Sequence, residues 1–241
     1  DEELLALAAG SELTQPEVLE AQARRLLETP RARAMVVAFH SQWLDLDRLE
    51  HTSKDPVLFP EFDEARRASM RAETERFVEH HVFDGDGTLG ALLTSSTTFV
   101  DAELAPLYGT SATGSGLSLV ELDPSQRAGL FTQASFLAGH AHPKIGSPVL
   151  RGVTLLESLL CHEPDPPPPG VDTSVTMGDG PNGDAKTTRE VYEQHVSDSA
   201  CQGCHVLIDP LGMPFESFDA VGRHRTPENG PPNDSTSPIT D

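Results

Sequence analysis

The chain has 241 residues, with 38 acidic side chains against 17 basic ones and a formal net charge of −21 at pH 7. This excess argues against nucleic acid and anionic lipid as partners, because both need patches of Lys and Arg. It suits a solvated surface or a cationic partner. No apolar run is long enough to span a bilayer, and the chain opens on Asp1 without a signal-peptide pattern. We therefore expect a processed product, a domain or a fragment.

The first half of the chain predicts helices, and no segment strongly predicts a strand. Residues 14–17, "TQPE", have the spacing of a capping box, with Pro16 in the first turn of a helix. Pro30 resets the register and begins a second helix. A third is expected from about 61 to 82, and a short one at 89–93. The third helix offers these core residues: Phe62, Met70, Phe77 and Val78.

The second half predicts further helices joined by irregular segments. Residues 109–119 are small and polar and form a natural boundary, and a helix is expected from Asp123-Pro124 to about Ala138. Ser147-Pro148 begins another helix, with an apolar stripe of Val149, Val153, Leu156, Leu159 and Leu160. A proline-rich linker covers about 163–186, and a short helix follows at 188–195. We expect a mainly α fold, with a helical domain at 1–110 and a second domain at 111–241.

The segment Cys201-Gln202-Gly203-Cys204-His205 carries two of the three cysteines. C-x-x-C-H is the attachment signature of c-type haem. Two cysteines three apart can form thioethers with the two vinyl groups of one haem edge, and the adjoining histidine can bind the iron. The motif predicts one covalent haem c held by Cys201, Cys204 and His205. Because haem c is attached outside the cytoplasm, it also predicts a periplasmic or extracellular location.

Two other chemistries compete for the same residues. A structural zinc ion needs a fourth ligand. Cys161-His162 could supply one, but a proline-rich gap separates it from the motif. A redox dithiol is expected at a helix N-terminus after a strand, whereas the residues before Cys201 predict helix and turn. Haem is the favoured alternative.

Five blocks resemble, in the same order, the large exported proteins of planctomycetes and myxobacteria that carry domains of unknown function (DUF1592 and DUF1588 type) beside c-type cytochrome motifs. They are residues 13–49, 59–82, 92–109, 127–171 and 201–225. The resemblance implies export, a haem c in the terminal block and a parent protein longer than this chain. It implies little about activity.

The sixth iron position decides between an electron carrier and a haem enzyme. Our preferred ligand is His142, in the loop "GHAHP", where Pro143 stiffens the backbone. The resembling proteins share an "HxHP…SPV.RG" pattern that this chain matches. His140 is the next candidate. Met213 is more suited to apolar contact with the haem than to ligation, and Met177 is a weaker candidate still.

Other residues near the motif or with metal-binding side chains have simpler interpretations. Phe215 and Phe218 are candidates to wall the haem, and Arg223 or Arg225 could pair with a propionate or lie exposed. Asp209-Pro210-Leu211-Gly212 predicts a tight turn. His80-His81 predicts a solvated helix end rather than a chelate. Cys161 predicts a buried free thiol, with an intermolecular disulfide as the alternative.

These features predict a mono-haem electron-transfer module, with His205 and His142 as ligands, that acts within a larger chain or assembly and exchanges electrons with a redox protein or a neighbouring haem domain. The alternative is a haem enzyme, peroxidase-like or oxygenase-like, with an open sixth position. Such an enzyme needs a distal acid–base group, which the sequence does not identify. A structural haem beside a partner-binding helical half is a third possibility.

Overall fold

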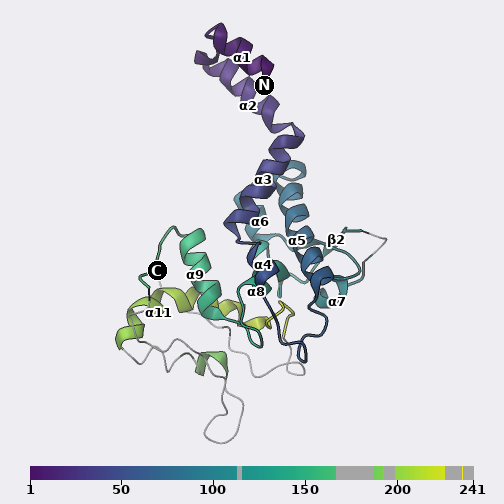
Figure 1. Ribbon diagram of the computed structural model, residues 1–241, viewed down its shortest axis with the longest axis vertical. Helices are drawn as coiled ribbons and strands as arrows, with labels where there is room; N and C mark the ends of the chain where they lie inside the picture. The colour runs from purple at the N-terminus through teal and green to yellow at the C-terminus, as the bar shows by residue number, and fades with distance from the viewer. Residues whose placement is uncertain (113–115, 167–186, 191, 193–198, 226–234, 236–241) are drawn as a thin grey trace, which may run out of the picture.

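The computed structural model describes residues 1–112, 116–166, 187–190, 192, 199–225 and 235, and it confirms a mainly α fold (Figure 1). Within these residues no helix is both long and apolar enough to cross a bilayer. The predicted linker lies outside the described residues from position 167 onward. The helix expected at 188–195 does so in part, although residues 188–190 and 192 are helical.

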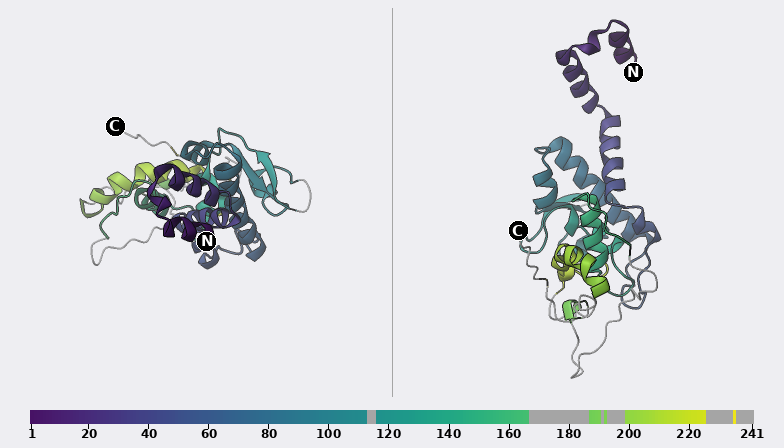
Figure 2. Two further views of the ribbon diagram at one scale, coloured as in Figure 1. Left: turned by 90° about the horizontal axis from the view of Figure 1, so that it is seen from above. Right: turned by 90° about the vertical axis from the view of Figure 1, so that its left-hand side faces the viewer.

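An arm of helices extends from the body at the N-terminal end (Figures 1 and 2). It consists of α1 (Glu2–Ala9) and α2 (Pro16–Leu27), and α3 (Pro30–Trp43) joins it to the body. The starts at Pro16 and Pro30 agree with the sequence, but the capping box at 14–17 is wrong. Because Pro16 takes the first helical position, the residue before the helix is Gln15 rather than Thr14, and its side chain forms no cap.

The body is built around α5 (Glu64–Glu79), which continues into a π-helical turn, His80–Asp84. Around it lie α4 (Arg48–His51), α6 (Leu89–Thr94) and α7 (Ala105–Tyr108). Strand β1 (Thr97–Val100) pairs antiparallel with β2 (Ser118–Glu121), with Thr97 opposite Glu121. The sequence did not predict these strands, because four residues carry too little alternation to stand out.

The predicted helix at 123–138 is wrong. Turns occupy its first part, followed by a 3₁₀ turn, Leu130–Thr132, and the short helix α8 (Ala134–Gly139). Gly129 has φ 63°, and a Cβ there would lie 2.2 Å from the carbonyl carbon of Leu93. The helical register cannot pass through this left-handed residue, which is pressed against another segment.

The C-terminal part adds α9 (Pro148–Ser158), α11 (Ser199–Gly212) and a 3₁₀ helix, Met213–Ser217. Two apolar clusters form the core, and residues before and after position 110 contribute to both. The first includes Leu44, Phe77, Phe136, Leu155 and Phe218. The second includes Met70, Val100, Leu104, Ala134 and Val221. The division at residue 110 stays a prediction about domains, and the helix that carries the cysteines packs on a core that both halves build.

Candidate functional site

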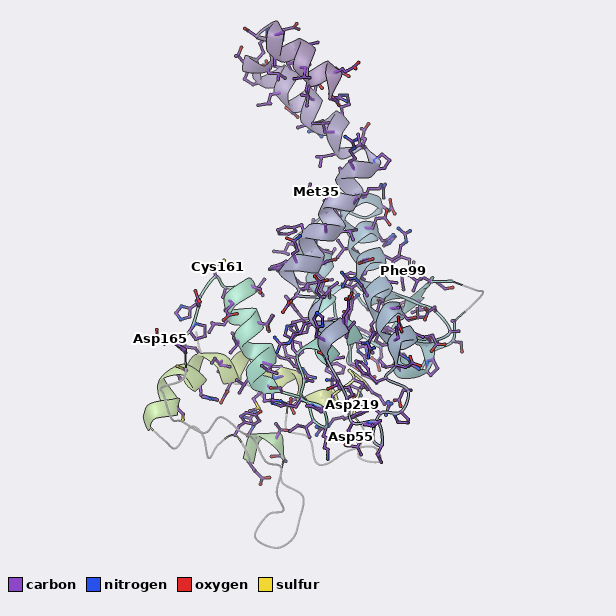
Figure 3. All side chains as sticks on the ribbon, viewed as in Figure 1. Met35, Asp55, Phe99, Cys161, Asp165 and Asp219 are labelled. Carbon is purple, nitrogen blue, oxygen red and sulfur yellow. The ribbon has the colours of Figure 1, made fainter. Side chains whose placement is uncertain are left out.

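Cys201, Cys204 and His205 lie on one helix, α11. Both thiols are free and half-buried, and their i, i+3 spacing places them on the same side of the helix, one turn apart. The Sγ atom of Cys204 lies 3.9 Å from the backbone oxygen of Asp165, in the segment that follows α9. Figure 3 labels Asp165 and, just past the end of α9, Cys161.

Two glycines let α11 pack closely against α9. A Cβ at Gly152 would lie 2.3 Å from the Ile208 carbonyl oxygen, and one at Gly212 would lie 1.8 Å from that of Pro148. Neither position has room for a side chain. The two contacts set an antiparallel register, in which the C-terminal end of α11 meets the N-terminal end of α9. The motif therefore stands on a helix whose position against α9 is closely fixed.

This packing corrects part of the predicted stripe of α9. Leu156 is buried as predicted, but Val149 and Val153 are only partly buried and Leu160 is exposed. The buried face also contains Gly152 and Arg151, which the stripe did not include. The side of α9 that faces inward is therefore the side that contacts α11 and the residues after it. A periodicity of apolar residues could not reveal a buried face that contains a glycine and an arginine.

Arg151 ties α9 to the segment after α11. Its guanidinium is fully buried and donates hydrogen bonds to three carbonyl oxygens, those of Phe215 at 2.9 Å, Leu137 at 3.1 Å and Asp219 at 3.1 Å. It also lies 3.5 Å from the carboxylate of Glu216, itself buried. These contacts satisfy most of a charge that would otherwise be costly to bury.

His205 has a charged partner one turn along the same helix. Its Nδ1 lies 2.9 Å from Oδ1 of Asp209, with 16% and 15% of the two side chains exposed. The hydrogen bond to Asp209 raises the pKa of His205 against the opposing effect of burial. Because Nδ1 faces the carboxylate, Nε2 is the ring nitrogen on the opposite side. The helix also runs on through Pro210 to Gly212, so the tight turn predicted at 209–212 is wrong.

Two exposed apolar side chains follow the motif directly. Val206 and Leu207, directly after His205, are 61% and 45% exposed, whereas the next residue, Ile208, is buried against α9. Two thiols, a histidine held by a carboxylate and uncovered apolar side chains on one helix fit a covalently attached porphyrin. For the zinc alternative, the described part of the chain contains no cluster of three or more His, Cys, Asp or Glu side chains that could hold a metal ion.

His142 and His140 lie in the loop between α8 and α9. His142 is half-buried, and its carbonyl oxygen accepts a hydrogen bond from Nζ of Lys54 at 3.2 Å. Burial, followed by the charges of Lys54, Arg151 and Arg48, lowers its pKa. This loop precedes the end of α9 that meets the C-terminal end of α11, whereas His205 lies in the middle of α11, about two turns before that end. Ligation by His142 stays a prediction.

His140 is almost fully buried. Its Nδ1 lies 2.9 Å from the carbonyl oxygen of Phe136, one turn earlier. Burial lowers its pKa to about 4, so the ring is neutral at pH 7. The sequence analysis named His162 only as part of a possible zinc site. It is exposed and lies three residues before Asp165, whose backbone contacts Cys204.

The side chains predicted to contact the haem lie just after α11. Met213 is buried, Phe215 is partly buried with its ring centre 6.0 Å from that of Phe136, and Phe218 belongs to the first apolar cluster. Arg223 pairs with Glu61 and lies 3.8 Å from Asp219, and Arg225 lies 4.0 Å from Glu216. The roles proposed for these residues toward a haem stay predictions.

Two interpretations of isolated residues are wrong. His81 is buried with its ring centre 4.2 Å from that of Phe77, so it is not a solvated helix end. His81 lies four residues after Phe77, and this helical spacing places both rings on the same face. Cys161 is exposed rather than buried, because the chain leaves α9 there through a positive φ of 54°.

A buried polar network that sequence reasoning missed lies inside the body. Glu73 accepts hydrogen bonds from Thr98 Oγ1 and from the Tyr108 hydroxyl, both at 2.6 Å. The Tyr108 hydroxyl in turn accepts from the backbone N–H of Ala134 at 2.9 Å. Burial raises the pKa of Glu73 to about 7. Its spacing from Met70 and Phe77 places Glu73 on the core face of α5, but the sequence does not show the hydroxyl partners that a buried glutamate needs.

Comparison with known families agrees with the resemblance drawn from the five blocks. Residues 1–110 match the PSD4 model, a protein of unknown function (DUF1592), and residues 127–228 match the PSCyt3 model, a protein of unknown function (DUF1588). The two matches agree with the DUF1592/DUF1588 type that the five blocks resemble, and the second family carries a cytochrome-like name. No curated protein and no solved structure matches the chain.

Proposed function

We propose that this chain is a mono-haem c-type cytochrome module that transfers single electrons outside the cytoplasm, as part of a larger protein or assembly. The observation that carries the proposal is the arrangement on α11, where two free thiols one turn apart precede a histidine that a carboxylate orients. The exposed Val206 and Leu207 beside them offer apolar surface for a porphyrin to cover.

The chain's own residues would perform the attachment and the ligation. Each thiol of Cys201 and Cys204 would add across a vinyl group, with sulfur bonding to one carbon and the thiol proton going to the other. His205 would bind the iron through Nε2 while Nδ1 stays on Asp209. When bound, the haem supplies an iron that takes one electron from a donor and gives it to an acceptor.

The test is to export the chain into a periplasm that contains the haem-attachment machinery and to purify the product. We expect a mass increase of one haem and an alkaline pyridine spectrum typical of two thioethers. Replacing Cys201 and Cys204 with Ala should abolish both signals. Exported, folded protein without covalent haem would overturn the proposal.

The haem enzyme is the competing function, and carbon monoxide distinguishes it. A carrier with two protein ligands should show little change in its ferrous spectrum when carbon monoxide is added. A large shift would indicate an open sixth position, as a peroxidase or an oxygenase requires. That result would replace electron transfer with catalysis.

A net charge of −21 suits a cationic redox partner. We expect electron exchange with a basic redox protein to slow as ionic strength rises, since screening weakens long-range attraction between charges. A stopped-flow titration with salt measures this dependence.

A further inference from the structure

The contact between His205 and Asp209 has a consequence for redox chemistry. Histidines that bind metals commonly donate their second ring N–H to a neutral carbonyl, a carboxylate or water. Here the acceptor is a carboxylate at 2.9 Å, and only about one sixth of each side chain is exposed. A hydrogen bond with one ionised partner is roughly twice as strong as a neutral one. Because this pair is mostly shielded from water, the solvent weakens its hydrogen bond less than it weakens that of a surface pair.

Two features of the backbone fix the positions of His205 and Asp209. His205 and Asp209 are four residues apart on α11, so their side chains lie over the same face of the helix. Ile208, directly before Asp209, has its carbonyl packed against Gly152 of α9, where no side chain fits. The carboxylate is therefore carried by a turn of helix that cannot slide along its neighbour.

We propose that Asp209 is a positioning residue that fixes the proton of His205 on Nδ1, directs Nε2 to the haem iron, and lowers the reduction potential of that iron. This inference rests on the proposed function. The carboxylate draws the Nδ1 proton toward itself, which raises the electron density on the ring and makes Nε2 a stronger donor. A stronger donor stabilises ferric over ferrous iron, so the one-electron couple shifts toward the oxidised form.

The central variant is Asp209→Asn. The amide oxygen can still accept from Nδ1–H, so the shape of the contact survives while its negative charge is lost. We expect the ferric-to-ferrous ratio at a given potential to fall about tenfold, which is a rise of about 59 mV in the midpoint of a one-electron couple. Asp209→Glu, which keeps the charge, should shift the midpoint less than Asp209→Asn does.

Asp165→Asn is the matched control. Asp165 lies beside Cys204 through its backbone and has an exposed side chain, so its replacement removes one charge near the motif without touching His205. Equal midpoints for the two Asn variants would mean that Asp209 acts only as one more negative charge, and would overturn the proposal. Far-ultraviolet circular dichroism of each variant checks that the helices remain.

A second measurement needs no haem. Nitrogen-15 shifts of His205 in the haem-free chain, at a pH where the ring is neutral, report which nitrogen carries the proton. We expect the Nδ1–H form in the native chain and a larger share of Nε2–H in an Asp209→Ala variant. The same tautomer in both would overturn the positioning role.

The outcomes separate the two proposals. Covalent haem with an unchanged midpoint in Asp209→Asn overturns this inference and leaves the proposed function standing. Folded, exported protein without haem overturns the proposed function and the lowered potential together. The nitrogen-15 result then decides by itself whether Asp209 sets the proton of His205.

Discussion

Glu73 has no exposed surface and sits between two hydroxyl donors, Thr98 and Tyr108, at 2.6 Å each. Burial in the body outweighs those hydrogen bonds and raises its pKa to about 7 from an ordinary 4.5. The folded chain thus holds a proton on this carboxyl that the unfolded chain has already released. A buried acid therefore makes the body sensitive to pH.

We expect the stabilisation from protonated Glu73 to be complete below about pH 4.5 and to be lost as the pH rises through about 7, since the folded-state pKa is the higher one. The full effect amounts to about 3 kcal/mol at most. Urea unfolding at pH 5 and pH 8 measures it. Glu73→Gln should show a smaller fall between the two values than the native chain, and an equal fall in both would contradict a raised pKa.

Arg151 offers a second test at the scale of single side chains. Because it is fully buried beside Glu216, replacing Arg151 with Met strands a buried carboxylate and should cost about 3–5 kcal/mol in the free energy of unfolding. Adding Glu216→Gln should recover part of that loss. A double variant that is destabilised by the full sum of the single changes would show that the two groups do not interact.

At the scale of elements, the close contact of α9 with α11 rests on Gly152. A methyl group there would lie 2.3 Å from the Ile208 carbonyl, so Gly152→Ala must push the helices apart. We expect a loss of about 1–3 kcal/mol, measured by thermal or urea unfolding. Gly203→Ala is the control on α11 itself, because no atom lies within 4 Å of the added Cβ. That change should be neutral or stabilising, since alanine favours a helix.

The loop between α8 and α9 carries the prediction on the sixth ligand. His142→Ala should convert a low-spin ferric spectrum to a high-spin one, whereas His162→Ala should leave it unchanged. The opposite result would move the ligand to the segment after α9, whose Asp165 backbone touches Cys204. Absorption spectra of the two purified variants decide between the loops.

The elements that the sequence predicted are those with local signals. Pro16, Pro30 and Ser147-Pro148 begin helices because proline suits a first turn and Ser147 accepts a hydrogen bond from the N–H of Leu150. The errors arise from tertiary contacts. The break at Gly129 and the buried face of α9 each depend on a neighbour far away in sequence.

The residues of the candidate site also divide into those that a local pattern reveals and those that depend on distant contacts. C-x-x-C-H is a contiguous motif that the sequence alone reveals, and the structure places its three residues on one helix. The pairing of His205 with Asp209 was missed, because residues 209–212 were predicted to form a tight turn and only a continuous helix brings side chains at i and i+4 together. The burial of Arg151 and Glu73 was also missed, since charged residues are ordinarily exposed and their partners come from other segments.

Across the whole molecule, burial is distributed unevenly. The body has two apolar clusters, whereas α1 buries no residue and α2 buries only Gln22. Exposed leucines, Leu5, Leu19 and Leu27, lie on this arm (Figure 2). Helices of this length gain little stability without packing.

We therefore expect amide hydrogens of α1 and α2 to exchange by local opening, at free energies well below those of α5 and α8. Hydrogen exchange followed by mass spectrometry of peptides from each helix tests this expectation. Equal protection of arm and body would mean that the arm is covered in solution.

The thiols, the histidine and its carboxylate partner all fall within nine consecutive residues, 201 to 209, on one helix. The residues proposed to attach the haem and to bind its iron on one side thus lie together in the sequence before any long-range contact forms. A ligand such as His142 is instead 63 positions upstream of His205 (205 − 142) and reaches the iron only when the chain has closed a large loop. Attachment of the haem would then precede folding, and the change of the iron from high to low spin would mark the completion of folding. The absorption spectrum of the haem would therefore report the progress of folding of the chain that carries it.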